Sequence, residues 1–207
     1  MSITLLLIIF TCAVSFWAFN DQRVFNSLKH QPVIEHRNGQ YYRMLTSGFL
    51  HGDFIHLFFN MFVLFEFGRF VEEYFSLIIP NQWYKVVFLL VYLFMIVAAD
   101  IPTYLKHKEN PYFASVGASG AVSGIIFMYI LLNPWAMLGL FGIIPIPAII
   151  FGGLYLWYSS WASKNSSDLI DHDAHFFGAV TGIFILIAIN PSVISTFLDQ
   201  LINQFPF

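Results

Sequence analysis

Two short glycine-containing motifs hold the residues best suited to chemistry. Ser119 lies in Gly117-Ala118-Ser119-Gly120, and His175 lies in Ala174-His175-Phe176-Phe177-Gly178. A serine hydroxyl within reach of an imidazole can act as a nucleophile, with the histidine as general base. Glycines let a substrate approach the backbone closely, and free N–H groups at a helix start can stabilise an oxyanion. The motifs therefore predict a Ser119–His175 dyad, because no carboxylate is obviously placed to complete a triad.

Both motifs lie in strongly apolar segments. Hydrophobic residues make up 58% of the 207 residues, charged residues only 10%, and the mean hydropathy is +0.71. A soluble domain carries about 25% charged residues. The composition therefore indicates an integral, multi-pass membrane protein, and the small net charge of −3 does not suggest a nucleic-acid partner.

Six apolar stretches each approach the roughly 20 residues that a helix needs to cross a bilayer. They lie at about 3–19, 55–75, 83–104, 115–133, 138–160 and 173–190. We therefore predict an all-α bundle of six transmembrane helices, forming a single domain over residues 1–207 with a long first loop at about 20–54. Pro145 and Pro147 fall inside the fifth stretch and predict an irregular helix there.

Helix order alone predicts that three polar residues lie at similar depth on the same side of the membrane. The second, fourth and sixth spans must all start on the same face of the membrane. His56, Ser119 and His175 lie within about two turns of those starts, so we expect them at similar depth.

Two further pairs have helical spacing. His56 and Asn60 are four residues apart and share a helix face, where they could donate to an oxyanion or form a polar contact between helices. Gly178 and Gly182 follow His175 on one face. This small-residue face predicts close packing against the fourth helix, which carries Gly120.

Taken together, these motifs resemble those of the rhomboid intramembrane serine proteases. The matching patterns are His56-x-x-x-Asn60, Gly117-x-Ser119-Gly120 and Ala174-His175-x-x-Gly178-x-x-x-Gly182. The resemblance implies the six-helix rhomboid fold, Ser119 as nucleophile and His175 as base. It also implies an oxyanion and substrate-binding site made by His56, Asn60 and the backbone around Gly117 and Ala118. The implied substrates are transmembrane proteins in the lipid bilayer, and no cofactor is implied.

The resemblance extends to two structural positions, and one departure from the family pattern bears on activity. Arg43 matches the arginine of the family's first loop, and Glu72 looks like its acidic residue at the far end of the second helix. The family often has an aromatic residue four positions after the nucleophile, stacked on the histidine. Ser123 stands there in this chain, so we expect looser histidine positioning or a ring from elsewhere.

Three alternatives accompany this interpretation. A metal site at Asp171, His172, Asp173 and His175 lacks the H-E-x-x-H pattern of helical zinc proteases. A catalytically weak or inactive rhomboid-like protein would bind transmembrane clients without cutting them, although such proteins typically lose the serine or the histidine. A transporter with broken helices in two symmetric halves has no sign in the sequence. We expect residence in a prokaryotic inner membrane, because the chain shows no extra domain.

Overall fold

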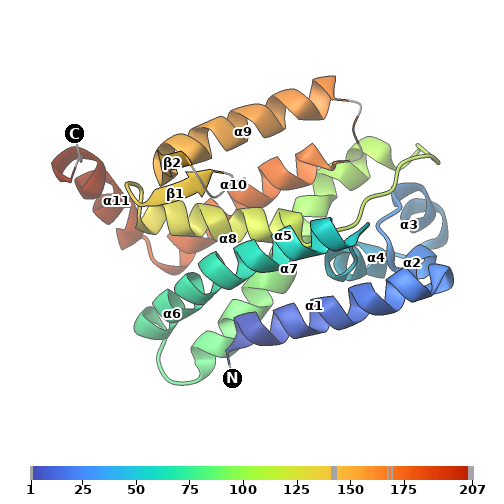
Figure 1. The fold of residues 1–207 in the computed structure, drawn as a ribbon, viewed down its shortest axis with the longest axis horizontal. Helices are drawn as coiled ribbons and strands as arrows, with labels where there is room; N and C mark the ends of the chain where they lie inside the picture. Colours follow the sequence, from blue (N-terminus) through green and yellow to red (C-terminus); the bar gives the residue numbers. More distant parts are fainter. Residues whose placement is uncertain (1, 141–143, 167, 169, 205–207) are drawn as a thin grey trace.

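The computed structural model describes residues 2–140, 144–166, 168 and 170–204 (Figure 1). Within these residues four helices are long and apolar enough to cross a membrane. They are α1 (Ile3–Asn20), the continuous helix Phe54–Ile78, α7 (Trp83–His107) and α10 (His172–Ile189). The second of these comprises α5 (Phe54–Val63), a π-helical turn at Leu64–Gly68 and α6 (Arg69–Ile78). The shorter apolar helix α8 (Ser119–Leu132) and helix α9 (Ala148–Asn165) complete a mostly helical membrane bundle, as predicted.

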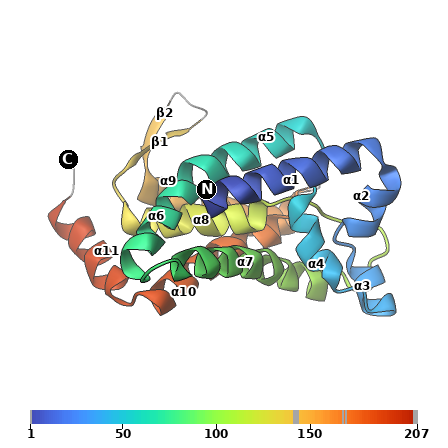
Figure 2. The ribbon, with the colours of Figure 1, turned by 90° about the horizontal axis from the view of Figure 1, so that it is seen from below.

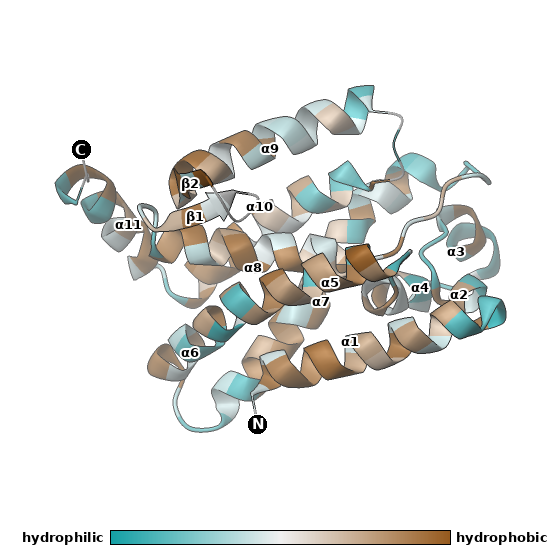
Figure 3. Cartoon of the chain, viewed as in Figure 1, coloured by the Kyte–Doolittle hydropathy of each residue, from teal (hydrophilic) through white to brown (hydrophobic). Residues whose placement is uncertain are grey.

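Helix α8 forms the centre of the bundle. Most of its side chains are buried, and it packs against α7 and α10 (Figures 1 and 2). The outer helices instead expose large apolar side chains, among them Phe58, Phe62 and Trp157. Figure 3 shows that apolar residues are spread along much of the length of the long helices. Such an exterior fits lipid rather than water.

The connection at 20–54, which we predicted to be a long loop, is largely helical instead. It contains α2 (Gln22–Leu28), α3 (Pro32–Asn38), α4 (Tyr42–Thr46) and the short turn η1 (Ser47–Phe49). Local signals explain these short helices. Asp21 caps the start of α2, Pro32 begins α3, and Gly39 ends α3 with a φ of 68°.

The predicted fifth span, 138–160, is wrong at its start. Strands β1 (Met137–Leu140) and β2 (Ile144–Pro147) form an antiparallel hairpin in which Met137 pairs with Pro147, and α9 begins only at Ala148. Pro145 and Pro147 therefore lie in β2 and do not bend a helix. Proline lacks an N–H donor and keeps the preceding residue out of the helical region, so this segment takes an extended form.

A last helix, α11 (Ser192–Asn203), follows α10 at one end of the bundle. The small helices α2–α4 gather at the opposite end, where α5, α8 and α10 begin (Figure 1). The three starts thus share one end, as helix order predicted.

Candidate active site

The segment before α8 presents Ser119 at the first position of the helix. Gly117 has a φ of 135°, a conformation that L side chains rarely adopt, and its N–H donates to the Ser47 carbonyl at 3.1 Å. Ala118 is fully buried and its carbonyl accepts from the N–H of Val122. The N–H groups of the first helical residues have no carbonyl to reach within their own helix. The N–H groups free to donate to a ligand's oxygen therefore begin at the helix start, while the Gly117 N–H, part of the predicted oxyanion site, already donates to Ser47.

Helix α10 brings His175 to the serine. Asp171 caps the helix by accepting from the Ala174 N–H at 2.9 Å, so the helix begins one turn before His175. The distance from His175 Nε2 to Ser119 Oγ is 2.8 Å. When the serine hydroxyl donates this hydrogen bond, Nε2 is the basic nitrogen of a neutral imidazole. The predicted pair therefore has the geometry of a nucleophile and its general base.

The close approach of α8 and α10 depends on glycines in both helices. A Cβ added to Gly178 would collide with the backbone of Gly120, and one added to Gly182 would collide with that of Gly124. No side-chain rearrangement relieves a contact with backbone. These four positions fix the separation of the two helices that carry the serine and the histidine.

A ring from α9 occupies the place that Ser123 leaves open. Tyr155 stacks on the His175 imidazole with ring centroids 6.2 Å apart and planes inclined by 24°. The Tyr155 hydroxyl is hydrogen-bonded to Ser123 Oγ, which also donates to the Ser119 carbonyl at 2.7 Å. The histidine thus has an aromatic neighbour from a different helix. No pattern in the sequence distinguishes the aromatic residue of α9 that fills this role.

His56 lies beside the serine, whereas Asn60 has another partner. A Cβ on Gly117 would lie 2.8 Å from His56 Cε1 and 3.6 Å from Ser119 Oγ, so the imidazole and the hydroxyl flank the same glycine. The Asn60 amide donates to the His56 carbonyl at 3.0 Å. His56 therefore lies close to Ser119, whereas Asn60 would have to leave its backbone partner to reach the site.

A second histidine, not singled out from the sequence, supports this part of the site. The His51 ring packs edge-on against His56 with centroids 4.8 Å apart, and its Nδ1 lies 3.0 Å from Ser15 Oγ. Ser15 Oγ donates to the Phe49 carbonyl, so His51 Nδ1 is the donor to Ser15. Burial, followed by the neighbouring His56, lowers the pKa of His51 to about 3. The imidazole of His51 is therefore uncharged, and it packs against His56 at the edge of the site.

Arg43 and Glu72 serve the scaffold at two other places. The Arg43 guanidinium donates to the carbonyls of Asn26 and Lys29 and to the Gln40 side chain, which holds α2 against α4. Glu72 accepts from the N–H groups of Ile3 and Thr4 at 2.7 and 2.9 Å. A carboxylate at a helix N-terminus is favourable, so Glu72 fastens α6 to the start of α1.

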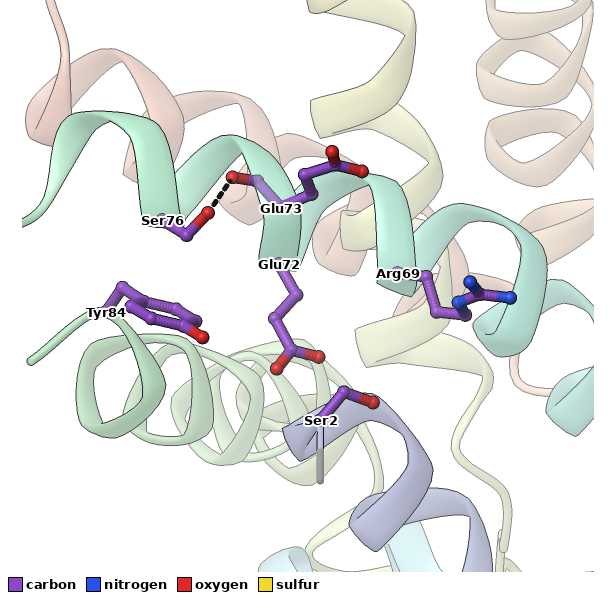
Figure 4. Close-up of a pocket in the computed structure, with 6 residues that line it drawn as sticks. All are labelled: Ser2, Arg69, Glu72, Glu73, Ser76 and Tyr84. Carbon is purple, nitrogen blue, oxygen red and sulfur yellow. Dashed lines mark hydrogen bonds between the residues drawn. The ribbon is translucent and has the colours of Figure 1, made fainter. Parts of the chain in front are cut away.

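Figure 4 shows Glu72 beside a shallow hollow of about 230 Å³ at the start of α1. The Glu72 carboxylate points toward Ser2, while the Arg69 guanidinium points away from Glu72.

Asp171, His172 and Asp173, at the start of α10, each interact with different partners. Asp171 accepts from Thr103 and Ser115, His172 bonds Asp168, and Asp173 pairs with Lys106 at 2.6 Å. Within the described part of the chain, no three histidine, cysteine or acidic side chains are grouped to hold a metal ion. The exposed carboxyl of Asp168 has its pKa lowered to about 2 by the hydroxyl of Ser166 and by His172.

Comparison with known proteins gives the family. The family model of the rhomboid domain matches residues 38–192, a range that includes Ser119, His56, His175 and the paired glycines. The chain therefore belongs to the rhomboid family.

Three curated relatives are similar to this chain. "Rhomboid-like protein 11, chloroplastic" of Arabidopsis thaliana is 31% identical over 73% of this chain and 53% of its own length. "Putative rhomboid protease YdcA" of Bacillus subtilis is 33% identical over 45% of this chain and 42% of its own. "RHOMBOID-like protein 12, mitochondrial" of Arabidopsis thaliana is 26% identical over 78% and 50%. The chain spans about half the length of the curated relatives it matches.

Proposed function

We propose that the protein is an intramembrane serine endopeptidase that cuts transmembrane proteins with a Ser119–His175 dyad. The observation that carries the proposal is the 2.8 Å separation of Ser119 Oγ and His175 Nε2 in a protein of the rhomboid family.

The proposed reaction divides between an acyl-forming and an acyl-releasing step. Ser119 Oγ attacks the carbonyl carbon of the scissile bond while His175 Nε2 takes the hydroxyl proton. His175 then gives this proton to the leaving amine as the C–N bond breaks. A water molecule then attacks the acyl carbon while His175 Nε2 takes its proton, and His175 gives this proton to Ser119 Oγ as the bond between Oγ and the acyl carbon breaks and the second product leaves as a carboxylic acid.

Charge on the tetrahedral oxygen is stabilised at the start of α8. The N–H groups of the first helical residues and the His56 imidazole would donate to it, with Asn60 as a further donor if its amide turns. A single such donor contributes about 10²–10³ in rate.

The length of α8 supports chemistry below the membrane surface. Its 14 residues rise about 21 Å, less than the ~30 Å of a hydrocarbon core. At least one end of α8 must then lie at membrane depth, and we place the non-helical segment before Ser119 there. Such backbone is tolerated where protein surrounds it or where it borders a water-filled cavity. A protein-enclosed site can hold a transmembrane segment, and a water-filled cavity can supply the water that hydrolysis of its peptide bond requires.

The proposed partners are transmembrane protein substrates, and the proposed setting is a lipid bilayer. The names of the relatives refer to a chloroplast and a mitochondrion, and one relative is bacterial. Residence in a prokaryotic inner membrane therefore stays a prediction.

Cleavage of a model transmembrane substrate tests the proposal. The purified protein in detergent should cut a single-span substrate, and Ser119→Ala should reduce the rate at least ~10⁴-fold while leaving the thermal unfolding temperature unchanged. Ser123→Ala is a matched control, because it removes a hydroxyl one turn further along α8. A stable wild-type protein that binds the substrate without cutting it would favour the inactive, client-binding alternative.

A further inference from the structure

The carboxylate of Asp171 joins three elements around the proposed dyad. It accepts from the Ala174 N–H at 2.9 Å, from Thr103 Oγ1 at 2.8 Å and from Ser115 Oγ at 3.1 Å. Ala174 precedes His175, Thr103 is a fully buried residue of α7, and Ser115 lies four residues before Ser119. One side chain therefore contacts both the residue before His175 and the segment that precedes Ser119.

Hydrogen bonds to other elements hold the segment before Ser119. Gly117 has a φ of 135°, a backbone conformation that side chains rarely adopt, and its N–H donates to the Ser47 carbonyl at 3.1 Å. The backbone of Ser115 exchanges two hydrogen bonds with His30, at 3.1 and 3.0 Å, and its hydroxyl donates to Asp171. Of these contacts, the one to Asp171 connects the segment to α10, the helix that carries the histidine.

The paired glycines do not supply the same constraint. They fix how closely α8 and α10 approach below the serine, through Gly120 against Gly178. The segment 115–118 lies before this contact, on the other side of Ser119. The Ser115–Asp171 hydrogen bond connects this segment to the start of α10.

We propose that Asp171 is a positioning residue that sets the distance between Ser119 Oγ and His175 Nε2. This inference rests on the proposed function for its catalytic consequence, although the geometry itself can be measured without catalysis. A displacement of about 1 Å between reacting groups costs up to ~10²-fold in rate. Asp171→Ala should therefore lower kcat by about 10–100-fold and change KM by less than about 2-fold.

Replacement by asparagine separates positioning from charge. In Asp171→Asn the carbonyl oxygen of the new amide could accept from Ala174 and Thr103, and its nitrogen could donate to the Ser115 hydroxyl. This variant should then retain activity within about 3-fold of wild type, because all three contacts survive without the charge. A loss as large as that of Asp171→Ala would overturn the positioning role in favour of an electrostatic one.

The decisive measurement is the ¹⁵N resonance of His175 Nε2 in protein labelled at histidine nitrogen, with His175→Ala to assign the signal. In Asp171→Ala the resonance should move to the position found in Ser119→Ala, where the hydrogen bond is absent. In Asp171→Asn it should stay at the wild-type position. A wild-type resonance in Asp171→Ala would overturn the proposal.

Two further variants keep this result interpretable. Ser115→Ala leaves the helix cap intact and should shift the resonance in the same direction, which protects the test if Asp171→Ala unfolds. Asp173→Ala removes an acidic residue from the same helical turn that pairs with Lys106 instead, and should leave the resonance unchanged. If the wild-type protein shows the hydrogen bond and its loss in Asp171→Ala but cleaves no substrate, the proposed function fails while the positioning role stands.

Discussion

Helices α9 and α10 both pack on α8, and they do so in opposite ways. Helix α10 meets α8 backbone to backbone, at the glycine pairs Gly120–Gly178 and Gly124–Gly182. Helix α9 reaches the site through a long side chain, Tyr155, and leaves much of its surface exposed. The helix that carries the proposed base is held by contacts that allow no adjustment. The helix that carries only a supporting ring is held by contacts that can adapt.

This difference explains which parts of the site demand particular residues. The proposed proton transfer between Ser119 and His175 requires a hydrogen-bond distance, so the helices that carry them would need a fixed separation. A stacking ring tolerates larger variation in distance and angle. The comparison can be tested by changing one residue at a time in each helix.

The largest effect is expected at the rigid interface. Gly178→Ala places a methyl group against the Gly120 carbonyl and forces α8 and α10 apart. We expect a loss of about 2–3 kcal/mol in the free energy of unfolding, measured by denaturant titration in detergent, from overpacking against backbone. Substrate cleavage should fall by ~10²-fold or more, because Ser119 and His175 separate. Wild-type stability in Gly178→Ala would contradict the tight interface.

An intermediate effect is expected at the adaptable interface. Tyr155→Ala removes the ring that stacks on His175 and should lower kcat by about 10-fold, since the imidazole gains freedom. Tyr155→Phe is the matched control. It keeps the ring and loses only the hydrogen bond to Ser123, so its kcat should stay within about 3-fold of wild type. Equal losses in both variants would show that the hydroxyl, rather than the ring, supports the site.

The smallest effect is expected on the outer face of α9. A Cβ at Gly153 meets no atom within 4 Å, so Gly153→Ala adds a methyl group in open space. Alanine is the better helix former, and stability should rise by about 0.5–1 kcal/mol with unchanged cleavage. A destabilisation as large as that of Gly178→Ala would mean that α9 is held as tightly as α10.

Much of the bundle could be predicted because membrane helices are recognisable by their apolar length. Five of the six spans correspond to helices of the structure, with shifts of a few residues at their ends. The prediction at 138–160 was wrong at its start because apolar residues alone do not define a helix. Pro145 and Pro147, from which we predicted an irregular helix, lie instead in the extended backbone of a hairpin, and each proline disfavours a helical conformation in the residue before it.

The contact between Ser119 and His175 could be predicted because each residue lies in a short motif at a helix start. The supporting residues could not. Tyr155 is one of several aromatic residues on its helix, and only the tertiary structure shows that it fills the space beside Ser123. Asp171 could be assigned to an acidic cluster, but its bonds to Thr103 and Ser115 join residues more than 50 positions apart.

The most direct test of the central claim is covalent labelling of Ser119 by a fluorophosphonate probe. Such a probe reacts with an activated serine, and a small probe does not require a transmembrane substrate to enter. Wild-type protein should be labelled, with the modified residue identified as Ser119 by mass spectrometry of peptides. Labelling should disappear in Ser119→Ala and fall by ~10²–10⁴-fold in His175→Ala, where the general base is missing. Equal labelling of wild type and Ser119→Ala would contradict the proposed serine nucleophile.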